Sequence, residues 1–231
     1  MDHLKRNTTL FGLKMSTPIL IGYMFLGFAY GVLLQQQGLA FIWTFLTSTL
    51  VFAGALQYAV VPMMTAAFDP ITVFILALSI NIRHFFYGIS IFDKYKEAGK
   101  IMPVLVYTMA DEAFSINAST HLPKSLDPPR FYLTVSILGY SYWVMFTSLG
   151  HLFASTVTIT VQGLDFVLPA LFFALFLNMW KQTSKQKTML FGVGATILSM
   201  LMIRNHLFVL ASMIIIFVGL TIETTKEQRH E

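Results

Sequence analysis

The sequence predicts an all-α integral membrane protein, and its composition is the first reason. Of the 231 residues, 56% are hydrophobic and 15% are aromatic, whereas only 11% are charged. A soluble domain carries about 25% charged residues, so this chain has too few to cover a water-exposed surface. The abundance of aromatic residues also excludes a disordered chain. The chain contains no cysteine, which excludes disulfides, thiolate metal sites and cysteine nucleophiles.

The second reason is the length of the apolar segments. A helix that crosses a bilayer needs about 20 apolar residues. Transmembrane barrel strands are about half as long and alternate in polarity, which these segments do not. We therefore expect a polytopic helical bundle of about six to eight transmembrane segments. The eight apolar segments cover residues 16–34, 39–68, 71–92, 101–118, 131–161, 166–180, 189–203 and 207–222.

The third reason is the position of the basic residues, which cluster between the apolar segments. The positive-inside rule places residues 1–15, the basic loops and the tail 223–231 in the cytoplasm. Eight plain spans would put the basic loop 94–100 outside. Six full spans put every basic loop inside, provided that segment 39–68 breaks near Gly54 and segment 101–118 also turns back. Both alternatives remain open, with two segments broken or re-entrant in the second.

We expect one transmembrane transporter domain over residues 1–231. The first apolar run is too long for a signal peptide, so the first helix is expected to be retained. No domain boundary and no internal repeat is visible along the chain. The net charge of +4 comes from the loops and indicates no nucleic-acid partner.

Polar residues inside the apolar segments are the candidate site, because a charge at the bilayer centre costs about 2.5–3.5 kcal/mol. Asn81, Arg83 and His84 lie close together in one segment. Arg83 would hold a carboxylate, with Asn81 or His84 lining the path. The alternative is that Arg83 extends to the nearby membrane surface. Three polar groups exceed what that alternative requires, so we favour the site.

Asp111 and Glu112 form the second candidate, in the middle of an apolar stretch. Two adjacent acids cannot both stay ionised there without partners. They would carry a proton or bind a substrate ammonium, with Arg83 as a partner for Asp111. The alternative is a solvated surface helix.

The third candidate is the stretch of small residues around Gly54, followed by Gln57. A helix broken here would present free backbone groups to a zwitterionic ligand. The alternative is a close helix contact with Gln57 as an interhelical hydrogen-bonding group. Other positions have structural interpretations: Gly27 and Gly31 form a packing seam, and Asp165 caps a helix with Pro169 near its first turn.

Enzyme motifs for zinc hydrolysis, serine hydrolysis or nucleotide binding are absent from the sequence, and the six histidines lack ligand spacing. We therefore expect no enzyme activity, no metal and no cofactor, and transport driven by a gradient or another subunit. The alternatives are an assembly or channel subunit, or an intramembrane hydrolase that uses His84 with Asp111.

The ordered polar blocks resemble the AzlC family of branched-chain amino acid exporters. The resemblance covers about residues 18–180, and the departures are Leu56, where a small polar residue is usual, and Tyr58, where Phe is usual. The blocks are Gly22-Tyr23, Gly27-Phe28-Ala29-Tyr30-Gly31, Ala53-Gly54-Ala55-Leu56-Gln57-Tyr58, Asn81-Ile82-Arg83-His84-Phe85-Phe86-Tyr87-Gly88, Asp111-Glu112-Ala113-Phe114, Leu164-Asp165-Phe166 and Pro169-Ala170-Leu171-Phe172.

The resemblance implies a multi-pass permease of the bacterial inner membrane that exports valine, leucine, isoleucine and also methionine. It also implies a small hydrophobic AzlD-like partner subunit. From the residues, we expect Arg83 to bind the substrate carboxylate and Asp111 or Glu112 to meet the ammonium or carry a proton. Gln57, Asn81 and Tyr87 would supply neutral hydrogen bonds, and Phe and Met residues would line the side-chain pocket.

Overall fold

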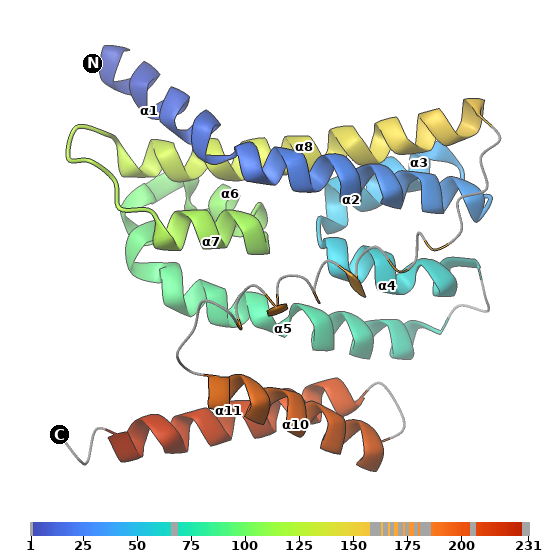
Figure 1. Cartoon of the computed structure of the whole chain (residues 1–231). Coiled ribbons are helices and arrows are strands. Elements are labelled where there is room, and N and C mark those ends of the chain that lie inside the picture. Colours follow the sequence, from blue (N-terminus) through green and yellow to red (C-terminus); the bar gives the residue numbers. More distant parts are fainter. Residues whose placement is uncertain are drawn as a thin grey trace. The chain divides into compact units, whose positions relative to one another are not determined.

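The computed structural model describes residues 2–65, 69–157, 186–203 and 207–227, together with positions 163, 166, 169, 170, 173, 176, 177 and 180. Every regular element in these ranges is helical (Figure 1). The elements are α1 (Asp2–Met15), α2 (Thr17–Gln36), α3 (Phe41–Leu46), the π-helix η1 (Thr47–Val51), α4 (Gly54–Thr65), α5 (Pro70–Tyr95), the 3₁₀-helix η2 (Lys96–Ile101), α6 (Met102–Tyr107), α7 (Asp111–Ser119), α8 (Pro128–Thr156), α10 (Gln186–Met202) and α11 (Leu207–Glu227).

The contacts divide the chain into two compact units. The first unit consists of Met1–Thr65 and Ile82–Leu168, and the second of Ala66–Asn81 and Pro169–Glu231. In the second unit α10 packs against α11, and the close approach of Gly219 to the Phe191 ring lets the two helices meet. The first unit contains nearly all the candidate residues. The single transmembrane domain expected from the sequence stays a prediction.

The exposed surface of the described helices is strongly apolar. Large side chains such as Phe25, Phe74, Phe85 and Leu201 are between 65% and 75% exposed. Such a surface suits lipid and not water. Within the described ranges, two stretches are long and apolar enough to cross a membrane, Thr17–Gln36 and Pro70–Tyr107. The number of full spans stays a prediction.

Two apolar segments are interrupted where the six-span alternative requires it. The first breaks at Phe52 and Ala53, between η1 and α4, and the second breaks after Tyr107, between α6 and α7. Figure 1 shows that the chain reverses its direction at each break, so that α4 runs opposite to α3 and α7 runs opposite to α6. Each interrupted segment therefore forms a helical hairpin.

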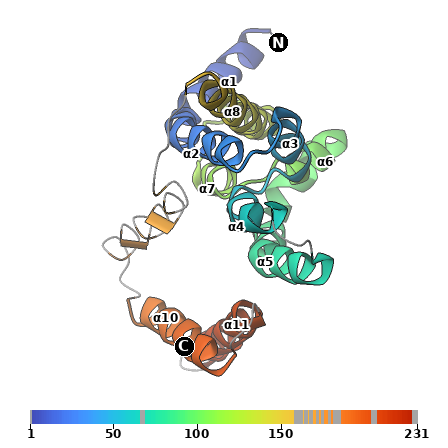
Figure 2. The same ribbon diagram turned by 90° about the vertical axis from the view of Figure 1, so that its right-hand side faces the viewer.

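Helices α2 and α8 form the most extensive helix pair of the first unit and run side by side (Figures 1 and 2). Small residues permit this contact. A Cβ atom on Gly31 would lie 2.6 Å from the His151 backbone nitrogen and closer still to the Thr147 carbonyl oxygen, and a Cβ on Gly150 would lie 2.8 Å from the Phe28 carbonyl carbon. Gly27 faces the same seam, where a Cβ would lie 3.1 Å from Phe146 Cβ. Backbones approach this closely only where side chains are absent.

Helix α1 lies against the start of α8. The Arg130 Nε donates to Thr9 Oγ1 over 3.0 Å, and the Asp127 backbone N–H donates to Thr8 Oγ1 over 3.2 Å. The rings of Phe11 and Phe131 are 5.7 Å apart. Pro128 begins α8, where a missing N–H is tolerated. Helix α1 is thus packed within the first unit, against α8.

The glycine seam gives a test of the α2–α8 contact. Gly31→Val should destabilise the protein by about 2 kcal/mol or more, because a side chain cannot enter the seam without separating the helices. Gly22→Val, in the same helix, should cost far less, since a Cβ there meets no atom within 4 Å. Thermal unfolding of the detergent-solubilised variants measures the difference. Equal losses for the two variants would contradict the packing.

Candidate functional site

Arg83 and Asp111 form an ion pair between the second half of α5 and the start of α7. The Arg83 Nη1 lies 2.9 Å from the Asp111 Oδ2, and the two side chains are 25% and 32% exposed. The other carboxylate oxygen of Asp111 is buried and has no hydrogen-bond partner among the described residues. The sequence suggested this partnership, and the structure places the two groups in contact.

Glu112 is held by a tyrosine from another helix. The Tyr23 hydroxyl of α2 donates to Glu112 Oε2 over 2.6 Å, and Tyr23 itself is 6% exposed. Both acids lie in the first turn of α7, where the free N–H groups of the helix terminus favour negative charge. When all three groups are ionised, Arg83, Asp111 and Glu112 carry one net negative charge, which suits a cationic ligand group.

Gln57, in the first turn of α4, is bound by Trp143 of α8. The Trp143 Nε1 donates to Gln57 Oε1 over 2.9 Å. An indole N–H can only donate, so the amide oxygen must face Trp143. The amide nitrogen of Gln57 is then buried with no hydrogen-bond partner in the described part of the chain. The residue is 1% exposed.

Aromatic rings link these two groups. The Trp143 ring lies 5.0 Å from the Tyr23 ring and 6.1 Å from the Tyr30 ring, measured between centroids. The side chains therefore form a continuous path from Gln57 through Trp143 and Tyr23 to Glu112. Gly54 lies beside this path, since a Cβ there would be 3.1 Å from the Trp143 ring.

The tips of the two hairpins meet at Tyr140 of α8. The Tyr107 hydroxyl, at the end of α6, donates to the Thr49 carbonyl oxygen, and the Tyr140 hydroxyl donates to the same oxygen over 3.0 Å. The Phe52 ring lies 4.9 Å from that of Tyr140. Phe52 has a left-handed backbone with φ of 42°, a strained conformation for a residue other than glycine. Strain of this kind is commonly found at functional sites.

One face of α5 holds α7 at both of its ends. Arg83 pairs with the first residue of α7, and the Lys94 Nζ donates to the carbonyl oxygens of Asn117 and Ala118 in its last turn. Between them the Tyr87 ring stacks on Phe114 with centroids 4.2 Å apart. A cation at a helix C-terminus is stabilising. These contacts fix where the acids of α7 lie.

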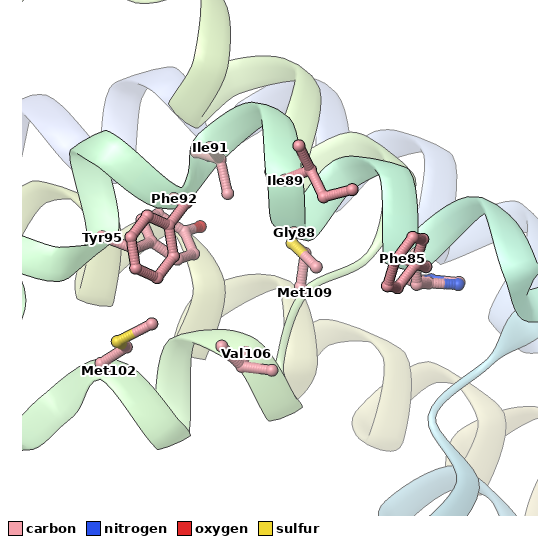
Figure 3. Close-up of a pocket in the computed structure, with 10 residues that line it drawn as sticks. Phe85, Gly88, Ile89, Ile91, Phe92, Tyr95, Met102, Val106 and Met109 are labelled. Carbon is pink, nitrogen blue, oxygen red and sulfur yellow. The ribbon is translucent and has the colours of Figure 1, made fainter.

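An apolar pocket of about 450 Å³ lies between α5 and α6 (Figure 3). His84 and Gly88 line it on α5, and His84 is the chain neighbour of Arg83. Met109, two residues before Asp111, lines it at the second helix break. Its other apolar lining residues include Phe85, Ile89, Phe92, Met102 and Val106.

The structure brings most of the candidate residues into the first unit. Asn81 and Pro169 are exceptions, because Asn81 ends one segment of the second unit and Pro169 begins the other. Asp165 lies outside the described residues, and Pro169 is described as helical and exposed. In the part of the chain that the structure describes, no three His, Cys, Asp or Glu side chains gather as a metal site.

Four aromatic residues at the candidate site were not predicted from the sequence: Tyr23, Trp143, Tyr107 and Tyr140. Each has a polar tip that bonds a site group or a hairpin tip. Such residues are common in apolar segments, because Tyr and Trp combine an apolar ring with one polar atom. The position of Tyr23 in a block of the family resemblance was the only available signal.

Comparisons with known proteins identify the family of this chain. The family described as "AzlC protein" matches residues 18–157. "Branched-chain amino acid transport protein AzlC" of Bacillus subtilis is 36% identical over 205 residues, 89% of this chain and 81% of that protein. A protein of Haemophilus influenzae named "Uncharacterized membrane protein" is 32% identical, covering 91% of this chain and 87% of its own length. "Inner membrane protein YgaZ" of Escherichia coli is 25% identical, covering 74% and 73%.

No solved structure matches the chain. The matched region 18–157 spans both hairpins and every residue of the ion pair and the aromatic path. The chain therefore belongs to the AzlC family of membrane proteins.

Proposed function

We propose that this chain is the permease subunit of a secondary active transporter that exports branched-chain amino acids, and also methionine, across the bacterial inner membrane. The name of the Bacillus subtilis relative supports the substrate class, and the name of the Escherichia coli relative supports the location. A small hydrophobic AzlD-like subunit as partner belongs to the same proposal.

The observation that carries the proposal is the charged cluster at the second helix break. Arg83, Asp111 and Glu112 lie inside apolar segments, where charges are expensive and normally mark a transport pathway. Their net negative charge suits the ammonium group of an amino acid. Asp111 and Glu112 would meet that ammonium or exchange a proton in its place.

The geometry changes the role proposed for Arg83. Its charge is matched by Asp111 at 2.9 Å, so it is poorly placed to attract a second carboxylate. In this proposal Arg83 positions Asp111 at the start of α7. Tyr23 does the same for Glu112 through its 2.6 Å hydrogen bond.

The apolar pocket supports a hydrophobic substrate. The pocket is lined by Met and Phe residues, which suit a leucine-like or methionine substrate side chain. The flexible Met side chains of the lining can adapt to substrates of different shape. Two lining residues are close in sequence to the ion pair, since His84 follows Arg83 directly and Met109 precedes Asp111 by two residues. An amino acid would place its side chain there and its ammonium at the acids.

Neutralising the cluster should abolish export. Cells loaded with leucine-containing dipeptides would release leucine faster with this chain and its partner, and Asp111→Asn or Arg83→Ala should remove that gain. The control is Asp93→Asn, which breaks the exposed 2.6 Å ion pair with Lys96 on the same stretch of helix. It should leave release within about twofold, because exposed ion pairs contribute little.

Membrane abundance of each variant is measured in parallel. Normal release by both Asp111→Asn and Arg83→Ala would contradict the site. A fall in abundance that accounts for the whole loss of release would favour the assembly-subunit alternative. A turnover product from a lipid or peptide substrate would favour the intramembrane hydrolase.

Filling the pocket should weaken the handling of large substrates. Gly88→Leu adds a side chain at a residue that lines the pocket, and a Cβ there meets no atom within 4 Å. The leucine concentration for half-maximal release should rise about tenfold or more, since burial of a leucine side chain contributes about 1.5–3 kcal/mol. Gly194→Leu in α10, which is equally unobstructed, should have no effect. An unchanged concentration for Gly88→Leu would separate the pocket from transport.

A further inference from the structure

The two halves of the first unit repeat one another in sequence spacing. Phe28-Ala29-Tyr30-Gly31 in α2 corresponds to Phe85-Phe86-Tyr87-Gly88 in α5, at an offset of 57 residues (88 minus 31). Helix α4 begins at Gly54 and α7 begins at Asp111, at the same offset (111 minus 54). The correspondence thus runs from the long helix to the broken hairpin without an insertion.

The structure shows the same correspondence with inverted direction. A long helix is followed by a broken hairpin twice, α2 by α3–α4 and α5 by α6–α7. In Figure 1 the second half of α5 runs opposite to α2, and the N-terminal ends of α4 and α7 both face the middle of the first unit. This is the arrangement of an inverted repeat, which transporters commonly contain. The repeat is not visible in the sequence alone, because only a few positions are identical.

The repeat places two neutral residues where α7 has its acids. Asp111 corresponds to Gly54, and Glu112 corresponds to Ala55. The first turn of α7 therefore supplies its own negative charges, whereas the first turn of α4 supplies none. The free N–H groups at a helix N-terminus attract anions. The first turn of α4 therefore has no acid of its own to accept from its free N–H groups.

Gln57 is an independent indication of a ligand at this turn. Its amide nitrogen is a buried donor that makes no well-formed hydrogen bond among the described residues, with the Tyr30 hydroxyl nearby, and the Trp143 hydrogen bond fixes its orientation. Side chains of a helix tilt toward its N-terminus, so a side chain at the fourth position of α4 lies over the first turn. A buried donor without an acceptor is costly, and an acceptor from a ligand would remove that cost.

We infer that the first turn of α4, with the Gln57 amide, binds the carboxylate of the transported amino acid. This inference rests on the proposed function and deepens it. The first turn of α7 binds the ammonium through Asp111 and Glu112. Trp143 and Tyr23 lie between the two turns and form the wall that the substrate contacts. One neutral and one acidic helix terminus thus select a zwitterion.

The test places a glutamate at Ala55, the position of the first repeat that corresponds to Glu112 in the second. Binding of labelled leucine is measured in membrane vesicles that contain the full chain and its partner, for Ala55→Glu and for the neutral, equally large Ala55→Gln. The added carboxylate should weaken leucine binding about tenfold or more through repulsion in a partly buried site. Ala55→Gln adds the same bulk without the charge, so it should weaken leucine binding clearly less than Ala55→Glu does.

Two leucine analogues identify which half of the ligand is affected. Isocaproate keeps the carboxylate and lacks the ammonium, and leucinamide keeps the ammonium and lacks the carboxylate. Ala55→Glu should abolish competition by isocaproate and leave competition by leucinamide. Gln57→Leu removes the amide donor and keeps a side chain of similar size. It should also weaken competition by isocaproate and not by leucinamide. It replaces Ala55→Glu in the test if that variant fails to reach the membrane.

The outcomes separate this inference from the proposed function. Selective loss of isocaproate competition in Ala55→Glu or Gln57→Leu supports the inference. Unchanged isocaproate competition in both variants, or its loss only in Arg83→Ala, overturns the inference while leucine transport stands. Absence of leucine binding by the unchanged chain with its partner overturns the proposed function and the inference with it.

Discussion

Backbone N–H and C=O groups inside a bilayer must form hydrogen bonds within the protein, because lipid offers none. This constraint is most severe at the two helix breaks, where the regular helical hydrogen bonds are interrupted. The Thr49 carbonyl, beside the first break, accepts hydrogen bonds from the Tyr107 and Tyr140 hydroxyls. One of those hydroxyls comes from the other hairpin and one from α8. The tips of the two hairpins are thus joined to each other and to α8 through the Thr49 carbonyl oxygen. Helix α8 is in turn held by α2 through a seam that only glycine permits at Gly31 and Gly150.

The same arrangement explains how the charges are accommodated. Helix α7 has acids in its first turn and Lys94 at its last carbonyl oxygens, so both ends of its dipole meet opposite charge. Arg83 and Lys94 come from one face of α5, which spans the length of α7. Breaking a helix at the acids therefore creates the N–H groups that stabilise them. In the first hairpin, the N-terminus of α4 carries no acids. A zwitterionic ligand could therefore bind with its carboxylate at α4 and its ammonium at α7.

The candidate site could be predicted in part because charge in an apolar segment is conspicuous. Arg83, Asp111, Glu112, Gln57 and the small residues at the first break stand out in the sequence for that reason. The pairing of Arg83 with Asp111 followed from the need to match charges. The partners of Glu112 and Gln57 did not follow, because each of these groups had several tyrosines and tryptophans available as donors.

The membrane class, the family and the ionisable residues of the candidate site are visible in the sequence, and the two helix breaks are one of the two alternatives that it allows. The tertiary structure decided which aromatic side chains complete the site. Tyr23 reaches Glu112 across 89 positions and Trp143 reaches Gln57 across 86. In a soluble protein, the polar face of each helix would have indicated its orientation. Here the lipid-facing and protein-facing sides are both apolar, so only the packing of α2, α8 and the hairpins fixes which side chains point inward.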